Sequence, residues 1–76
     1  MKMVGTVTRV IEYGVFVDFP HVADDKVIVI DGFLHRTDSI GKTPDMTKRF
    51  KLGDRIGVEV KEIDRLGRFN LREYMM

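Results

Sequence analysis

Hydrophobic and polar positions alternate most clearly over residues 14–19, which read Gly-Val-Phe-Val-Asp-Phe. In a β-strand the odd-numbered residues of this run would share one apolar face, which leaves Phe16 on the opposite face. Tyr13 directly precedes this strand, and Pro20 is predicted to end it. Because an exposed aromatic pair costs solubility and adds nothing to a core, Tyr13 and Phe16 are the first candidates for a binding surface.

Four further stretches have the β-branched or alternating composition of strands. In chain order they are residues 3–11, 27–35, 56–63 and 68–72. Alternation fails between Val7 and Val10, which predicts a β-bulge or a sharp coil in the first strand. Residues 21–26 are predicted to form a polar loop, and Asp31-Gly32 to break or bend the strand that follows. Residues 64–67 are typical of a hairpin turn.

A short helix is predicted between the third and fourth strands. Thr43 supplies a capping hydroxyl, Pro44 suits the first helical position, and Asp45 favours the positive end of a helix. This helix would end near Lys51. Five short strands with one short helix after the third describe an all-β, five-stranded barrel of the oligonucleotide/oligosaccharide-binding (OB) type. We expect residues 1–76 to form this one domain.

Composition removes several classes of function. The chain has no cysteine, which excludes disulfides and thiolate zinc sites and fits a reducing compartment. No apolar run is long enough to span a membrane and no signal-peptide pattern opens the chain, so we expect a soluble, cytoplasmic domain. The glycines are scattered singly and the two histidines are far apart. We therefore expect no enzymatic activity, no cofactor and no metal site.

The charge is unevenly distributed, although the net charge is only +1. Residues 1–31 carry three bases and five acids, a balance of −2. Residues 32–76 carry ten bases and seven acids, a balance of +3. The second half could therefore form a basic patch, and the alternative is ordinary solvated charge.

Four motifs follow one another over nearly the whole chain. They are Gly5-x-Val7-x-x-Val10-x-x-Tyr13-Gly14-Val15-Phe16-Val17-Asp18, Gly32-Phe33-Leu34-His35, Gly53-Asp54-x-Ile56-x-Val58-x-Val60 and Ile63-Asp64-x-x-Gly67-Arg68-x-Asn70-Leu71. Together they closely resemble the S1-type RNA-binding domain, the repeat of ribosomal protein S1, polynucleotide phosphorylase and several ribonucleases. The resemblance implies an OB-type barrel that binds single-stranded RNA.

The resemblance also implies a binding site at five positions, which are Tyr13, Phe16, His35, Asp64 and Arg68. Tyr13 and Phe16 would stack on bases, and His35 would stack or form a hydrogen bond. Arg68 would contact phosphate or lie flat on a base. Asp64 would orient Arg68 or accept a hydrogen bond from a base or a ribose hydroxyl, and it is also an ordinary turn residue.

The chain departs from the family pattern in three places. The segment between Asp18 and Gly32 is longer than usual, so residues 27–30 are predicted to extend a hairpin or to contact a partner. The start is short, and Arg72-Glu73 follows Leu71 where the family usually has a serine. Four further basic side chains could contact phosphate, namely those of Arg9, Arg36, Lys61 and Arg72.

These observations predict a module that binds single-stranded RNA weakly and with little sequence preference. Its partners would be the RNA and a larger parent protein or complex of RNA processing, decay or translation. The alternative is a protein-interaction module on the same fold, such as a mimic of the alpha subunit of a translation initiation factor or an assembly domain. The oligomeric state is left open.

Overall fold

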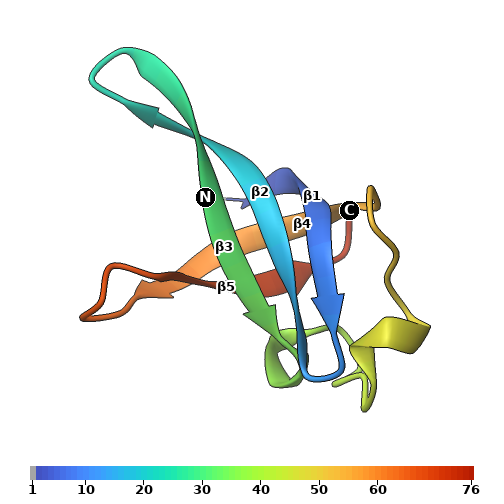
Figure 1. Ribbon diagram of the computed structural model, residues 1–76. Helices are drawn as coiled ribbons and strands as arrows, with labels where there is room; N and C mark the ends of the chain where they lie inside the picture. Colours follow the sequence, from blue (N-terminus) through green and yellow to red (C-terminus); the bar gives the residue numbers. More distant parts are fainter. Residues whose placement is uncertain (1) are drawn as a thin grey trace.

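The computed structural model describes residues 2–76, whose strands close into a barrel (Figure 1). The strands are β1 (Lys2–Ile11), β2 (Gly14–Ala23), β3 (Lys26–His35), β4 (Arg55–Ile63) and β5 (Phe69–Tyr74). Around the barrel they follow the order β1-β2-β3-β5-β4. The β3–β5 pair is parallel and the other neighbouring pairs are antiparallel. The prediction of an all-β, five-stranded OB-type barrel is confirmed.

The core is built from the inward side chains of the five strands and from two residues of the β3–β4 connection. Its buried members are Val7, Val15, Val17, Phe19, Leu34, Met46, Phe50, Ile56, Val58 and Leu71. The strand residues among them follow the alternation seen in the sequence. Met46 and Phe50 close one end of the barrel, since both are buried although they lie outside the strands.

β1 pairs with two strands: its first half pairs with β4 and its second half with β2. Its register against β2 shifts between Val7 and Arg9, which favours the bulge over the sharp coil of the two predicted alternatives. Gly5 allows β1 to pack closely against β2, because a Cβ there would collide with Val17 Cγ1. The bulge and this close approach together allow one strand to turn from one partner to the next.

The predicted end of β2 at Pro20, and the polar loop after it, are wrong. β2 continues to Ala23 and β3 begins at Lys26, so that only the two-residue turn Asp24-Asp25 separates them. Both turn residues have positive φ, 51° and 63°, as a two-residue hairpin of type I′ requires. Pro20 is accommodated because its nitrogen belongs to the outer edge of the β2–β3 ladder, where no donor is needed.

The predicted break of the third strand at Asp31-Gly32 is also absent. Gly32 pairs with Val17 of β2 and with Phe69 of β5. A Cβ at this position would come within 2.8 Å of Leu71 Cδ1 and 2.9 Å of Phe19 Cε1. Gly32 therefore serves close packing inside the barrel, and the strand passes through it without interruption.

The connection between β3 and β4 contains two 3-10 turns in place of the predicted helix of residues 44–51. They are η1 (Arg36–Asp38) and η2 (Met46–Lys48). Asp45, and not Thr43, caps η2, because its carboxylate accepts a hydrogen bond from the backbone N–H of Thr47. Burial of Met46 and Phe50 fixes the path of this segment, and a segment this short gains little from helical cooperativity.

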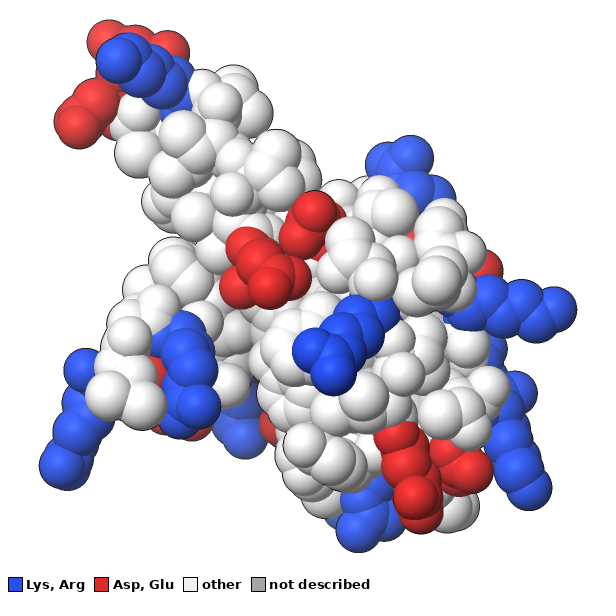
Figure 2. All heavy atoms as spheres, in the orientation of Figure 1, with Lys and Arg blue, Asp and Glu red and all other residues white. Residues whose placement is uncertain are grey.

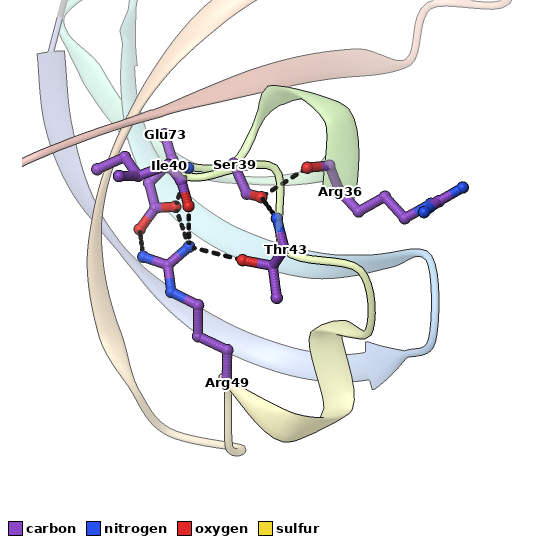
Figure 3. Close-up of polar contacts among 6 residues, drawn as sticks. All are labelled: Arg36, Ser39, Ile40, Thr43, Arg49 and Glu73. Atoms are coloured by element: carbon purple, nitrogen blue, oxygen red, sulfur yellow. Dashed lines mark hydrogen bonds and ion pairs between the residues drawn. The ribbon is translucent and has the colours of Figure 1, made fainter.

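A charged clasp ties this connection to β5 (Figure 3). Arg49 donates two hydrogen bonds to the carboxylate of Glu73, with Nη1–Oε1 at 2.7 Å and Nη2–Oε2 at 2.6 Å. Glu73 also accepts from the backbone N–H of Ile40 at 2.9 Å. The Glu73 side chain is only 6% exposed, and that of Arg49 is 34% exposed. Glu73 thus anchors a segment that has no long helix to hold it, and it lies one residue after the position where the family usually has a serine.

Candidate nucleic-acid interface

The strand register places a row of side chains across the outer face of the barrel. Arg9 of β1 lies opposite Phe16 of β2, Phe16 lies opposite Phe33 of β3, and Phe33 lies opposite Asn70 of β5. The neighbouring inward row contains Val15, Leu34 and Leu71, all buried. Since side chains alternate between the two faces of a strand, burial of that row obliges the adjacent one to face outward.

Phe33 is the centre of an aromatic cluster on this face. Its ring centroid lies 5.0 Å from that of Phe16, 6.1 Å from that of Tyr13 and 6.2 Å from that of His35. Tyr13 and His35 also contact each other, with ring centroids 6.2 Å apart. We call Tyr13, Phe16, Phe33 and His35 the aromatic platform. Each of the three predicted members packs against Phe33, for which the sequence predicts only a place in the third strand.

Gly14 makes room for the platform. A Cβ at Gly14 would collide with the ring of Phe33 and would lie 2.9 Å from the carbonyl oxygen of Leu34. The three glycines with positive φ are elsewhere in the chain, so Gly14 is required for space and not for an unusual backbone conformation.

His35 ends β3 and holds the start of the next segment. Its Nδ1 accepts a hydrogen bond from the backbone N–H of Thr37 at 3.2 Å and lies 2.9 Å from the Thr37 hydroxyl. This contact caps η1 and orients the imidazole beside Tyr13. Nε2 is therefore the ring nitrogen that can meet a ligand.

Asp64 organises the β4–β5 hairpin and orients Arg68. Its carboxylate accepts hydrogen bonds from the backbone N–H groups of Leu66 at 2.9 Å and Arg68 at 3.0 Å. It also accepts from Arg68 Nε at 2.9 Å and, more weakly, from Asn70 Nδ2 at 3.4 Å. The backbone N–H of Arg68 is the main reason that the pKa of Asp64 is lowered, with the Arg68 side chain and Leu66 contributing further. Of the roles left open by the sequence, the turn and the orientation of Arg68 are both present.

A pocket of about 370 Å³ lies between the platform and this hairpin. It is lined by Tyr13, Phe16, Phe33, Asp64, Arg68 and Asn70. The fold thus brings four of the five predicted site residues to one pocket, although Phe16 and Arg68 are far apart in the sequence. His35 stands beside the pocket, in contact with two of its aromatic walls.

The structure also distinguishes among the four further bases. The guanidinium carbon of Arg9 lies 5.6 Å from the ring centroid of Phe16, so Arg9 extends the platform. Lys61 Nζ is 3.2 Å from Asp38 Oδ1, and Arg72 Nη1 is 3.7 Å from Glu59 Oε1. Arg36 extends away from the contacts of the β3–β4 connection (Figure 3). Arg9 is therefore the strongest of the four candidates for a phosphate contact.

Within residues 2–76, no group of three or more histidine, cysteine, aspartate or glutamate side chains could hold a metal ion. Over the same residues the structure has no helix with the length and apolar character needed to cross a membrane. No protein-family model matches the chain, and a search of curated proteins finds no match to it.

Because the pKa of Asp64 is lowered by folding, its contribution to stability is present at neutral pH and is lost as the pH falls through the folded-state pKa. We expect Asp64→Asn to destabilise the protein at pH 7. The free energy of unfolding of this variant should then fall less than that of the wild type as the pH is lowered. Urea unfolding from pH 7 down to about pH 2.5 measures this difference. Asp25→Asn, at the tip of the other hairpin, controls for the loss of one charge. An equal loss of unfolding free energy on acidification in the wild type and in Asp64→Asn would contradict a lowered pKa for Asp64.

Proposed function

We propose that this domain binds single-stranded RNA through the aromatic platform, as a module of a larger RNA-processing, RNA-decay or translation protein in the cytoplasm. The observation that carries the proposal is the convergence of the platform, Arg9 and Arg68 on one face. Aromatic faces stack on unpaired bases at roughly 1–3 kcal/mol per base, and arginines contact the phosphates between them. The resemblance to the S1-type domain points to the same class of ligand.

The row that crosses the strands suggests the path of the RNA. Arg9 stands at one end of the row, Phe16 and Phe33 lie in its middle, and Asn70 lies beyond them beside Arg68. A strand that follows this row would place two bases on the phenylalanine rings, with a guanidinium on either side for its phosphates. Since any base offers a π-face, we propose little sequence preference.

The expected affinity is low. Two stacked bases and two or three charge contacts must offset the cost of ordering a flexible strand. We expect a Kd in the micromolar range or weaker, where 1 μM corresponds to about −8.2 kcal/mol. A module of this kind gains effective affinity when a parent protein tethers it beside other binding sites. The proposed role is binding, with no catalytic step.

A fluorescence-anisotropy titration of a labelled single-stranded RNA of about ten nucleotides tests this function, repeated from about 50 to 300 mM KCl. Each phosphate neutralised on a single strand contributes about −0.7 to the slope of log K against log salt. We expect a slope of about −1.4 to −2.1, because two or three basic side chains can reach the phosphates of the RNA.

A duplex of the same sequence is the matched control and should bind more weakly, because its bases are already stacked. The alternative, a protein-interaction module on this face, predicts no binding at high micromolar concentrations of protein. An affinity for the single-stranded RNA that does not change with salt concentration would also contradict the proposal.

A further inference from the structure

The β2–β3 hairpin extends well beyond the barrel, and we call residues 20–29 the arm (Figure 1). Pairing of β2 with β1 stops at Asp18, and pairing of β3 with β5 begins only at Gly32. Between these limits the two strands pair with each other alone. An isolated two-stranded ribbon is marginally stable in water, so the arm contributes little to the fold.

The arm exposes apolar side chains that have no role in the core. Val22, Val27 and Val29 are 68%, 70% and 68% exposed. The register pairs Val22 with Val27 and Pro20 with Val29, and alternation places all four on the same face as the platform. Figure 2 shows this stretch as an uncharged surface between charged groups at the tip and acidic groups at the base of the arm.

The outer edge of β3 is open along the arm. In a hairpin closed by a two-residue turn, Ala23 and Lys26 form a hydrogen-bonded pair, and such pairs then recur at every second position. The N–H and C=O groups of Val27, Val29 and Asp31 consequently point away from β2. The opposite edge, on β2, carries Pro20, which has no N–H and blunts that edge against strand addition.

Acidic groups stand at both ends of the open edge. Asp31 lies opposite Asp18 at the base of the arm, and Asp24 and Asp25 form its tip. None of these carboxylates takes part in an ion pair among residues 2–76. Across the neighbouring strands, Asp18 of β2 lies opposite Thr6 of β1, and Thr6 lies opposite Arg55 of β4. Thr6 therefore separates Asp18 from this basic side chain.

The two carboxylates at the base repel each other. Partial desolvation raises the pKa of Asp31, although much of its side chain stays exposed, and Asp18 raises it further through a hydrogen bond and through repulsion. A cation supplied from outside would relieve this repulsion. With Asp18, Asp24, Asp25 and Asp31 against Lys26 alone, the region repels both RNA and the arm of a second copy.

We infer that the open edge of β3 binds an extended, basic-flanked segment of a partner protein as an added strand. The spacing defines the segment: two alternating apolar residues would lie beside Val27 and Val29, with a lysine or arginine near Asp31 and another near Asp25. At about 3.3 Å per residue, these six steps span roughly 20 Å. Backbone hydrogen bonds supply affinity in such strand addition, and the alternate side chains supply specificity. This surface goes beyond the proposed RNA site and does not depend on it.

The probe is the peptide Gly-Lys-Thr-Val-Thr-Val-Thr-Lys-amide, labelled with fluorescein on the amino group of its glycine, so that both lysines keep their charge. The matched control has glutamate in place of both lysines. Fluorescence anisotropy with the full chain should show at least about tenfold weaker binding of the acidic peptide, because it meets like charge at both ends. In ¹⁵N spectra, the amides of Val27 and Val29 should shift with the basic peptide. Equal binding of the two peptides, or no binding of either, would overturn the inference.

Paired proline variants identify the edge. Val29→Pro removes an outward N–H from β3 and should weaken peptide binding by about tenfold or more. Val22→Pro makes the same change on the β2 edge and should leave binding within about twofold. Equal loss in both variants would contradict binding at the β3 edge. Neither variant should alter RNA binding, so failure of this inference is distinguishable from failure of the proposed function.

A charge swap tests the inference without a proline. Asp25→Lys combined with Asp31→Lys should reverse the preference, so that the acidic peptide binds more tightly than the basic one. Two other outcomes would overturn the inference. One is concentration-dependent dimerisation in sedimentation that Val29→Pro abolishes, since the edge would then bind a second copy. The other is a shift of the arm amides when single-stranded RNA is added.

Discussion

Phe33→Ala should weaken the binding of single-stranded RNA by about 1–3 kcal/mol, roughly 5- to 150-fold at 25 °C. Phe33 is the residue on which Phe16, Tyr13 and His35 all pack, so its loss removes one stacking surface and loosens the others. Fluorescence anisotropy at low salt measures the effect, and circular dichroism confirms that the variant folds. Leu52→Ala, at an exposed position outside the strands, should bind RNA as the wild type does.

Phe33→Leu separates stacking from packing. Leucine keeps an apolar side chain at the centre of the platform but has no π-face for a base. If stacking drives binding, Phe33→Leu should lose most of the affinity that Phe33→Ala loses. A leucine variant with wild-type affinity would show that Phe33 acts only by supporting its neighbours. Phe16→Ala alone and combined with Phe33→Ala completes a double-mutant cycle, in which we expect non-additive losses because the two rings are 5.0 Å apart.

Glu73→Gln should destabilise the fold by about 2–3 kcal/mol. Removing one partner of a buried ion pair typically costs about 3–5 kcal/mol, and the partial exposure of Arg49 reduces this figure. Glutamine keeps the size of the side chain and an acceptor for Ile40 N–H, so the change reports mainly on the charged, two-point contact with Arg49. Equilibrium urea unfolding followed by circular dichroism measures the loss.

Glu59→Gln is the matched control, because Glu59 lies 3.7 Å from an exposed Arg72. Surface pairs of this kind contribute about 0–1 kcal/mol, so this variant should be close to the wild type. Similar losses of stability in Glu59→Gln and Glu73→Gln would show that the Arg49–Glu73 pair stabilises the fold no more than an exposed ion pair does. Arg49→Met combined with Glu73→Met should restore part of the stability lost in Glu73→Gln, since an apolar pair leaves no buried charge unpaired.

The strands could be predicted because their pattern has a local physical cause. Alternation at Val15, Val17 and Phe19 places three apolar side chains on one face in any strand, whatever the strand packs against. The bulge between Val7 and Arg9 was predictable for the same reason, because a bulge shifts the alternation of side chains along the chain.

Features that depend on partners distant in the sequence could not be predicted in the same way. Pro20 is a reliable local signal for the end of a central strand, but it lies at an edge here, where its missing N–H has no consequence. Thr43 to Lys51 carries the local signals of a helix, yet burial of Met46 and Phe50 and the Arg49–Glu73 clasp fix another path. In both cases a long-range contact outweighs a weak local preference.

The sequence by itself determined the strands, the bulge in β1 and the outward position of Phe16, because these follow from the period of side chains along a strand. Only the tertiary structure decided which residues meet. Phe33 became the centre of the platform because the β2–β3 register sets it opposite Phe16, and Arg9 joined them through the register of β1. The sequence predicted that residues 27–30 extend a hairpin, and the register confirms this extension. The open edge of the arm is a tertiary result, since β1 and β5 pair with the hairpin only up to Asp18 and from Gly32. Register and the ends of pairing depend on the whole barrel, and no single stretch of the chain contains them.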